Sequence, residues 1–458
     1  MEFIHQPYQP GETITAIATP PGEGGVAIIR ISGKEAISAA SKIFSGPVHS
    51  YKTHTAHFGQ IRNLAGAHID DVLLFVMLGK RSYTGEDTVE IHCHGGSLIT
   101  RRVLETVLAA GPRTARPGEF TFKAYMNGKL DLAQAEAVQQ LIGAKNEHAL
   151  DAAENILKGA LSKKITTFQK DLTLIAAILE AWVDFPEEGL EFASMEEVCQ
   201  QLEQTKQQMQ QLVETFHDGR IVQEGISLCL IGSPNVGKSS LMNALLDKDR
   251  AIVSEIPGTT RDLLEDHMRL NGLNLRLIDT AGIRHSTEIV EQEGIRRSRR
   301  AMTDADLILF VLDAGKALNS DEETLMKQLP SKKTIVVRNK IDLPHQASLE
   351  IDFLHVVNIS AKEKTGLDQL RHTIDQVIWE HGPPARDEVL ITNIRHKEAL
   401  MQAIIACSGL ITGLQTGVSP EFLAFDMRQC LNELGKIIGV NITEDILSAI
   451  FSTFCIGK

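Results

Sequence analysis

The spacing of hydrophobic residues divides the chain into regions of different character. Over residues 1–118, short β-rich runs alternate with turns, and helices are expected at 34–44 and 97–110. Runs of this kind, separated by turn residues, are typical of a small α+β domain. The β-rich runs are 13–18, 25–31, 71–78 and 88–91.

Apolar residues recur at helical spacing over residues 119–216. The pattern predicts one long amphipathic helix through 156–182, which Asp184-Phe-Pro-Glu-Glu188 interrupts. A second helix is expected over 195–216. This region therefore has the character of a helical domain.

The helical pattern resumes after Gly382-Pro-Pro384, so two helical blocks flank a segment of alternating strands and helices. We expect that α/β unit, at 217–380, to be inserted in one helical domain built from 119–216 and 381–458. The helices predicted in the second block are 399–414, 421–438 and 443–454.

The segment Gly232-Ser-Pro-Asn-Val-Gly-Lys-Ser239 fits the P-loop pattern between a buried strand and a helix. Gly232 and Gly237 let backbone N–H groups point at phosphate oxygens. Lys238 places a positive charge on the β- and γ-phosphates, and Ser239 offers its hydroxyl to Mg²⁺. The helix N-terminus that follows also favours an anion.

Further nucleotide motifs follow in order, each after a predicted strand. The carboxylate of Asp279 can hold the Mg²⁺ shell, and Asp342 can accept from two N–H groups of guanine that adenine lacks. Together the motifs predict a GTP-binding domain. The nucleotide-contacting residues expected in them are Asn235, Val236, Gly237, Lys238, Ser239, Ser240, Asp279, Thr280, Ala281, Gly282, Asn339, Lys340, Asp342, Ser360, Ala361 and Lys362.

The dipeptide Asn271-Gly272 favours a tight hairpin between the runs 266–270 and 273–278. A hairpin between the P-loop helix and the strand that precedes Asp279 is the arrangement of Ras-like proteins. The expected fold is therefore α/β plus all-α, with a Ras-like P-loop unit inside the helical domain.

Ras-like enzymes place a water-orienting glutamine directly after the Asp-x-x-Gly motif, and this chain has Ile283 there. An aliphatic side chain cannot polarise water. One substitute is the side-chain carbonyl of Asn235, which could hold a monovalent cation. Another is the carboxylate of Glu291, which could orient water. From spacing alone, a solvated acidic face is the favoured interpretation of Glu291.

Composition narrows the class of protein. The length of 458 residues predicts about two or three domains, and 43% apolar with 23% charged residues is ordinary for a globular protein. The net charge of −13 argues against a broad nucleic-acid surface. No apolar run is long enough for a bilayer, and no signal peptide precedes the chain, so a cytoplasmic protein without a membrane is expected. The cysteines carry no C-x-x-C pair and are interpreted as reduced thiols.

The chain resembles the MnmE family (also called TrmE) of tRNA modification GTPases from end to end. The last of the matching segments is specific because it fixes a motif against the chain end. The segments are Gly24-Gly-Val-Ala-Ile-Ile-Arg-Ile-Ser-Gly33, Tyr83-Thr-Gly-Glu-Asp87, Arg116-Pro-Gly-Glu-Phe120, Lys129-Leu-Asp-Leu-Ala-Gln-Ala-Glu136, Gly258-Thr-Thr-Arg-Asp262 and Phe454-Cys-Ile-Gly-Lys458.

The resemblance implies an N-terminal domain, at 1–118, that binds a tetrahydrofolate derivative (5-formyl- or 5,10-methylene-tetrahydrofolate) and mediates homodimerisation. It implies a K⁺-activated GTPase that forms a heterotetramer with the flavoprotein MnmG (GidA). Together they would add an aminomethyl or carboxymethylaminomethyl group to C5 of the wobble uridine, U34, of certain tRNAs. Whether glycine or ammonium is the co-substrate stays open.

The resemblance also implies roles for residues that the pattern alone leaves unassigned. It makes Glu291 the catalytic glutamate and Cys455 a residue of the modification function. The potassium positions are Asn235, Ser254, Ile256 and Thr259, the magnesium positions are Ser239 and Thr260, and the folate positions are Arg30, Glu90, Lys129 and Lys458.

Two other functions compete with this one. A ribosome-assembly GTPase would use the same P-loop as a regulatory switch, but such a factor would carry a basic RNA-binding domain that the charge of −13 does not support. A folate-dependent methyltransferase with a vestigial nucleotide domain conflicts with the intact nucleotide motifs.

Overall fold

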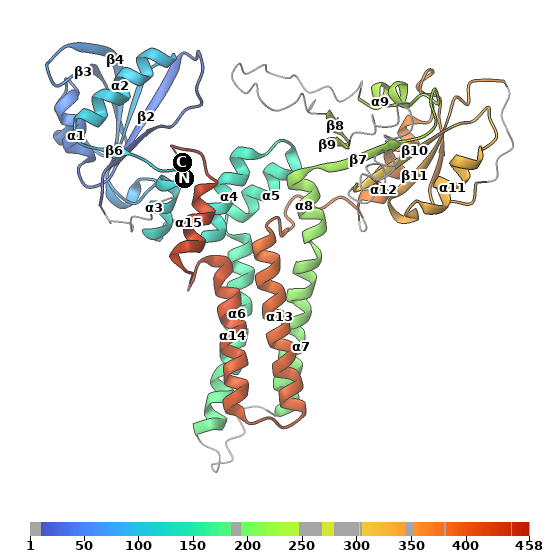
Figure 1. Ribbon diagram of the computed structural model, residues 1–458. Coiled ribbons are helices and arrows are strands. Elements are labelled where there is room, and N and C mark those ends of the chain that lie inside the picture. The colour runs from blue at the N-terminus through green and yellow to red at the C-terminus, as the bar shows by residue number, and fades with distance from the viewer. Residues whose placement is uncertain are drawn as a thin grey trace, which may run out of the picture.

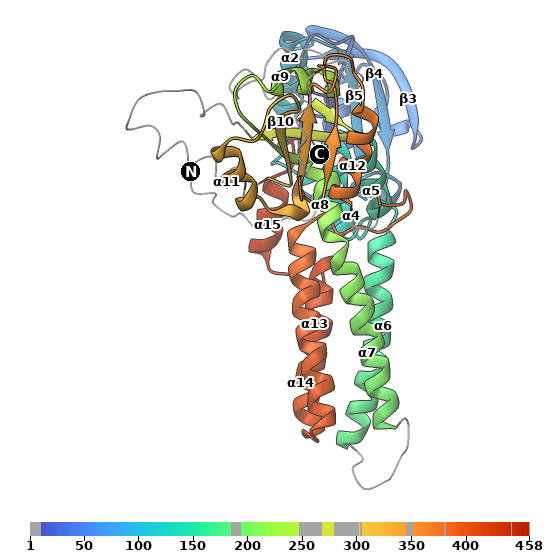
Figure 2. The same ribbon diagram turned by 90° about the vertical axis from the view of Figure 1, so that its right-hand side faces the viewer.

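A computed structural model describes residues 11–184, 194–246, 268–278, 302, 305–344, 351–379, 382–440 and 442–457. Figure 1 shows two bodies that each contain a sheet, on either side of the upper end of a long helical stalk, and Figure 2 shows the stalk from the side. Both ends of the described chain contact the N-terminal body, since the Gly11 N–H donates to Glu86 and the Gly457 carbonyl oxygen accepts from Arg30.

The N-terminal body is one mixed sheet of order β3-β4-β5-β2-β1-β6, in which only β1 and β6 pair in parallel. Its helices α1 (Ala36–Ile43) and α2 (Ser97–Ala109) share a hydrophobic core with one sheet face. The strands are β1 (Ile14–Ile17), β2 (Val26–Ser32), β3 (Thr55–Arg62), β4 (His68–Met77), β5 (Thr88–His94) and β6 (Arg113–Thr114).

Every strand and helix expected in this region is present, but the two-residue strand β6 was not predicted from the sequence, and neither was β3. Most of its residues are half-buried or exposed, because β3 is an edge strand that pairs only with β4. The alternation of polar and apolar residues in Thr-Ala-His-Phe is interrupted at Gly59, and its apolar members Ala56 and Phe58 are exposed, so the run is short for a strand with one buried face.

The stalk is a four-helix bundle of α6 (Ala160–Asp184), α7 (Met195–Glu214), α13 (Ile394–Gln415) and α14 (Pro420–Ile438). Helix α6 packs on α14 and α7 packs on α13, so each half of the bundle is completed by the distant half. In the described part of the chain, α13 alone is long and apolar enough to cross a membrane, and half of its apolar window is buried in the bundle.

The long helix predicted over 156–182 is wrong, because the chain breaks between α5 (Glu147–Leu157) and α6. Gly159 has φ +83°, a left-handed conformation that ends α5 and redirects the chain. The remaining helices near the stalk are α3 (Glu119–Met126), α4 (Leu132–Gly143), α8 (Phe216–Glu224) and α15 (Glu444–Ser452).

The second sheet has the order β12-β11-β10-β7-β9-β8 and is parallel except for the β8–β9 hairpin. Asn271 and Gly272 have φ of +51° and +77°, which confirms the predicted tight turn. The elements are β7 (Ile226–Ile231), α9 (Lys238–Leu246), β8 (Met268–Leu270), β9 (Leu273–Ile278), β10 (Leu307–Asp313), α11 (Ser320–Gln328), β11 (Thr334–Asn339), β12 (Val356–Asn358) and α12 (Leu367–Ile378).

Helix α5 belongs to two cores at once. Its residues Ala149 and Ala152 pack in the core of the second sheet, whereas Ile156 packs in the core of the stalk. The side chain of Asn146 caps the helix and donates to the Val222 carbonyl oxygen at 3.0 Å. The inserted unit is thus packed on the helical domain through this helix.

Candidate functional site

The P-loop lies between β7 and α9, where the glycines are required by close contacts. A Cβ on Gly232 would lie 2.2 Å from the Val311 carbonyl oxygen, and one on Gly237 would lie 2.3 Å from Asn339 Nδ2. Asn235 has φ +63°, a left-handed conformation that asparagine tolerates better than most residues. The loop therefore has the tight curvature that phosphate binding needs.

Lys238 lies at the first turn of α9 and directs its ammonium group back over the loop. Its Nζ donates to the carbonyl oxygens of Gly232 at 2.6 Å and Ser233 at 2.9 Å. Burial lowers the pKa of Lys238. Next to it, Ser239 and Ser240 are exposed, so their hydroxyl groups are open to a ligand.

The Asn339-Lys340 pair ties the P-loop to the neighbouring loops. Asn339 Nδ2 donates to the Val236 carbonyl oxygen at 2.8 Å, and Asn339 Oδ1 accepts from the Ala361 N–H at 3.0 Å. Lys340 Nζ donates to the Asn235 carbonyl oxygen at 2.7 Å. Residues from three predicted motifs thus meet at the carboxyl ends of β7, β11 and β12, as parallel strands dictate.

Asp342 is exposed at the edge of this site and held by Ser360, whose Oγ donates to Asp342 Oδ1 at 2.6 Å. This hydrogen bond, with the charges of Lys362 and Lys340, lowers the pKa of the Asp342 carboxyl group. An ionised, oriented carboxylate is the acceptor that the two N–H groups of guanine require.

Two contacts around the P-loop were not predicted. The Asp313 carboxylate accepts from Lys340 Nζ at 2.8 Å, and Ser233 Oγ donates to Glu322 of α11 at 2.6 Å. A polar residue directly after the apolar strand 307–312 was the available signal for Asp313. Nothing in the local sequence pairs Ser233 with Glu322, because 89 residues separate them.

Several predicted site residues lie outside the described residues, and the structure does not place them. They are Ser254, Ile256, Thr259, Thr260, Asp279, Thr280, Ala281, Gly282, Glu291 and Lys458.

A second group of predicted residues meets in the N-terminal body. Arg30 and Glu90 are cross-strand partners on β2 and β5, and Arg30 Nε donates to Glu90 Oε1 at 2.8 Å. Both side chains are half-buried, which strengthens the ion pair relative to a fully exposed one. The guanidinium carbon lies 5.9 Å from the centre of the Tyr83 ring and 5.6 Å from that of Phe120, at cation–π distance.

The C-terminal tail reaches the same place. Arg30 Nη1 donates to the Gly457 carbonyl oxygen at 3.4 Å, and the Gly118 N–H donates to the Cys455 carbonyl oxygen at 3.3 Å. A Cβ on Gly457 would lie 2.3 Å from the Ile17 carbonyl oxygen, so the tail contacts β1 closely. Upstream, Phe451 and Phe454 pack with Phe122 and Tyr125 in one aromatic cluster, which fixes where the tail begins.

The remaining two predicted residues, Lys129 and Cys455, form no hydrogen bond or ion pair with Arg30 or Glu90 through their side chains in the described structure. Lys129 is exposed and donates to the Lys80 carbonyl oxygen at 2.8 Å, so the structure gives it a partner other than Arg30 or Glu90. Cys455 is the exposed cysteine of the six, while burial raises the pKa of the other five thiols, for Cys93 and Cys229 to about 11. Of the six thiols, that of Cys455 is the most exposed to reagents in solution.

Comparisons with known proteins agree with this arrangement. The family model described as GTP-binding protein TrmE N-terminus matches residues 13–129, and the MnmE helical domain model matches residues 132–455. The chain is 69% identical over 460 residues to the tRNA modification GTPase MnmE of Protochlamydia amoebophila, with 100% of both chains covered. It is 40% identical over 453 residues to that of Geobacter sulfurreducens, covering 98% of this chain and 99% of the relative.

Among solved structures, Aquifex aeolicus Era bound to GDP.AlF4- matches 40% of this chain and 66% of its own at 25% identity, with a TM-score of 0.26. The two domain models and the full-length relatives match nearly the whole chain. Their names agree with the P-loop and the guanine motif, which lie at the carboxyl ends of parallel strands. The chain belongs to the MnmE family of tRNA modification GTPases and is a GTP hydrolase.

Proposed function

We propose that this protein is a potassium-activated GTPase that works with MnmG to modify C5 of U34 in certain tRNAs, using a folate one-carbon unit. The observation that carries the proposal is the contact between the C-terminal tail and Arg30. It brings the thiol-bearing end of the chain beside the two charged residues expected to bind folate. Neither a frayed terminus nor a solitary surface ion pair would account for this arrangement.

The GTPase proposal rests on the P-loop. Asn235 is exposed in a left-handed conformation, with its backbone held by Lys340, so within the described part of the chain its side chain is available to coordinate K⁺. The cation would supply positive charge where other GTPases use an arginine finger. Ser254, Ile256 and Thr259 would complete the potassium shell and Ser239 and Thr260 would hold Mg²⁺, while Glu291 would orient the attacking water.

The folate proposal rests on the paired charges of Arg30 and Glu90. A carboxylate suits the N–H edge of a pterin, and a guanidinium suits the carboxylate end of folate. Lys458 extends the tail beyond Gly457 and would add a second cation. Lys129 would contribute from the surface, after exchanging its present contact with Lys80 for the ligand.

Homodimerisation through the N-terminal domain is supported by a sheet face that α1 and α2 leave uncovered. On it, Phe58 and Leu73 are directly opposite on β3 and β4, with 76% and 44% of their surfaces exposed. Val26 of β2 is 58% exposed. Apolar side chains gathered on one face mark an interface, and we assign it to a second copy of the chain.

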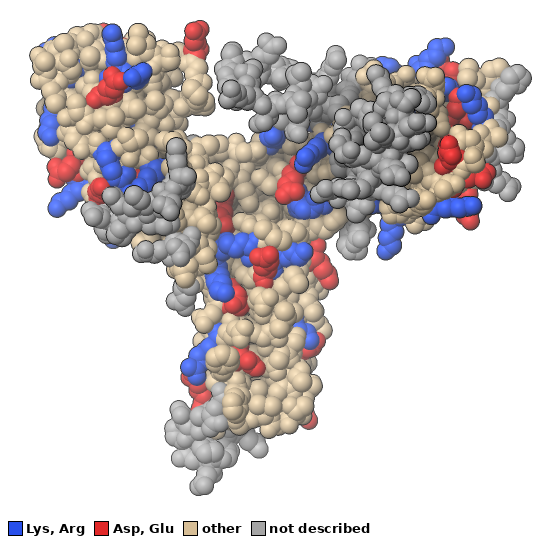
Figure 3. All heavy atoms as spheres, viewed as in Figure 1, with Lys and Arg blue, Asp and Glu red and all other residues tan. Residues whose placement is uncertain are grey.

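We assign domain limits of 1–118, 119–216 with 381–458, and 217–380, and a cytoplasmic location where GTP and tRNA are present. Figure 3 shows basic and acidic side chains interspersed on the visible face of the N-terminal body and stalk. A mixed surface of this kind suits local contacts with tRNA, the rest being supplied by MnmG in a heterotetramer.

The test is complementation of a deletion strain, with tRNA nucleosides measured by mass spectrometry. The wild type should restore modified U34, whereas Arg30→Met should not, because it removes the charge but keeps the length of the side chain. In parallel, calorimetry with 5-formyl-tetrahydrofolate should give binding by the wild type only. A deletion strain with normal U34 but accumulated ribosomal precursors would favour the ribosome-assembly alternative.

A further inference from the structure

Lys123, on α3, is a fully buried cation, because none of its surface is exposed to solvent. Its Nζ donates to Glu86 Oε2 at 2.7 Å and to the Glu12 carbonyl oxygen. The second carboxylate oxygen of Glu86 accepts from the Gly11 N–H at 3.3 Å. Removing two charges from water costs free energy that offsets their attraction, so a buried ion pair adds little net stability. Stability alone therefore does not explain why this ion pair is present.

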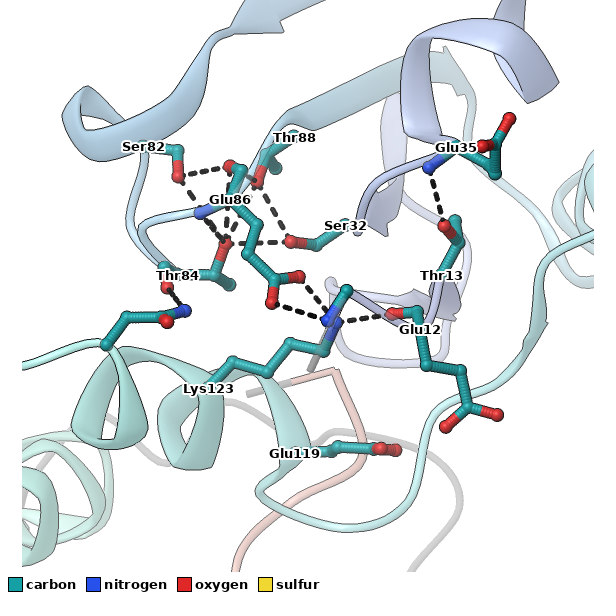
Figure 4. A network of polar contacts seen from close by, with 12 residues as sticks. Glu12, Thr13, Ser32, Glu35, Ser82, Thr84, Glu86, Thr88, Glu119 and Lys123 are labelled. Carbon is teal, nitrogen blue, oxygen red and sulfur yellow. Dashed lines mark hydrogen bonds and ion pairs between the residues drawn. The ribbon is translucent and has the colours of Figure 1, made fainter. Parts of the chain in front are cut away.

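The backbone around Glu86 is fixed by buried hydroxyl groups (Figure 4). The Glu86 carbonyl oxygen accepts from Ser82 Oγ and, at 3.1 Å, from Thr88 Oγ1. Ser32 Oγ on β2 lies 2.7 Å from Thr84 Oγ1 and 3.1 Å from Thr88 Oγ1. The loop 82–87 is therefore attached to the same strand, β2, that carries Arg30.

Three contacts attach this loop to α3 as well. They are the Lys123–Glu86 ion pair, the bond between Tyr83 and Thr121 hydroxyl groups at 2.9 Å, and the bond from Asn127 Nδ2 to the Thr84 carbonyl oxygen at 2.8 Å. Of the three, only the ion pair joins two charges, and its Lys123 side chain has no exposed surface.

The loop and the helix each supply one aromatic ring next to Arg30. Tyr83 comes from the loop and Phe120 from the first turn of α3. An arginine side chain has several rotatable bonds, so its guanidinium group is placed only as well as the groups around it are placed. The distance between the rings depends on the contact between loop and helix.

We infer that Lys123 is a positioning residue for the folate site: its ion pair with Glu86 holds loop 82–87 against α3, so that Tyr83 and Phe120 confine Arg30 in the orientation that binds the ligand. This inference rests on the proposed folate function and adds to it a buried group that touches no ligand. It also gives a role to Tyr83-Thr-Gly-Glu-Asp87 and Arg116-Pro-Gly-Glu-Phe120, which contain none of the expected folate-contacting residues.

The test uses the full chain with two changes. Lys123→Met keeps the length of the side chain but leaves the Glu86 carboxylate buried without its cation, so this variant is expected to lose stability. The double variant Lys123→Met/Glu86→Gln has no buried charge in the pair and should regain a Tm close to the wild type. Arg101→Met is the matched control, because Arg101 pairs with Glu105 on the exposed face of α2.

Two quantities are measured on each variant: hydrogen exchange of the peptide covering 82–88, and the Kd for 5-formyl-tetrahydrofolate. In the double variant, exchange should quicken and Kd should rise by at least about tenfold, a factor that corresponds to 1.4 kcal/mol. GTP hydrolysis should stay at the wild-type rate, which confirms that the rest of the chain is folded. The Arg101→Met variant should match the wild type throughout.

The outcomes separate the two proposals. If the double variant has wild-type folate affinity or wild-type exchange, Lys123 serves stability alone and the inference is wrong. If the wild type itself binds no folate, the proposed folate function is wrong, and the exchange data still decide whether Lys123 positions the loop.

Discussion

The nucleotide site and the site around Arg30 are built in opposite ways. The described nucleotide motifs are short contiguous segments, each at the carboxyl end of a parallel strand. The Arg30 site joins β2, β5, the loop at 83, α3 and the tail, and its longest contact spans 427 residues. The first site is specified locally and assembled by sheet topology, whereas the second needs residues from both ends of the chain.

This difference has a practical consequence for perturbation. A change in a contiguous motif alters one step of nucleotide chemistry, since its neighbours in the site are fixed by the sheet. A change in a remote segment can remove the Arg30 site while leaving the nucleotide site intact. The predictions below use this difference.

The largest expected effect comes from deleting residues 455–458. Modified U34 should fall to the level of a deletion strain, because Arg30 loses the Gly457 carbonyl oxygen and the site loses Cys455. GTP hydrolysis by the same truncated protein should change by less than about twofold, since no described contact joins the tail to the second sheet. Normal U34 in tRNA from cells with the truncated protein would refute the role of the tail.

Replacing K⁺ by Na⁺ should lower GTP hydrolysis roughly a thousandfold, the lower end of what an arginine finger contributes. Asn235→Ala should remove this ion dependence, but alanine also strains a backbone at φ +63°. Asn235→Gly is the matched control, because glycine accepts that conformation and lacks only the side chain. Equal rates in the two salts, or K⁺ activation retained by Asn235→Gly, would contradict the potassium site.

The substitution Asp342→Asn should change the preference for GTP over xanthosine triphosphate by roughly a thousandfold, since two hydrogen bonds to a charged group are exchanged for mismatched ones. The measurement is competitive binding of the two nucleotides. Ser360→Ala removes the bond that orients the carboxylate but keeps its charge, so GTP affinity should fall by only about tenfold. A variant Asp342→Asn with unchanged preference would mean that the base is recognised elsewhere.

The smallest effect concerns the link between the halves of the helical domain, where buried Glu136 pairs with Arg395 and His396. Burial alone would raise the pKa of Glu136, but the charges and hydrogen bonds of His396 and Arg395 lower it to about 2. Glu136→Gln should therefore lower the free energy of unfolding at pH 7 by about 3 kcal/mol.

The pH dependence of this effect has a definite sign. A lowered carboxyl pKa stabilises the folded state above its ordinary value of 4.5, and this contribution is lost as the pH falls from 4.5 towards 2. Denaturant unfolding of the wild type and Glu136→Gln should thus give converging stabilities over that range. A constant difference between them would show that the carboxylate charge is not what stabilises the cluster.

The sequence predicts the features that contiguous segments specify, and it does not predict those that join distant segments. The P-loop, the hairpin at Asn271 and the two-block helical domain are encoded in local spacing, and the structure contains each of them. Strand β3 and the break at Gly159 were missed, because neither changes the local hydrophobic pattern enough. The Lys123–Glu86 and Ser233–Glu322 contacts could not be predicted, because only the folded topology brings such residues together.

The bundle of the stalk has a consequence for biosynthesis. Glu136 and His396, which contact each other, are 260 residues apart in the sequence. A similar length of chain separates α6 from α14, on which it packs. At about 5–20 residues per second, the first half of the bundle leaves the ribosome roughly 10–50 s before its partner exists. During that time its apolar stripe, which includes Leu172, Ile175 and Leu179, has α7 beside it but lacks the native cover of α14. Chaperones therefore have a long interval in which to bind this chain, and the inserted nucleotide domain sets its duration.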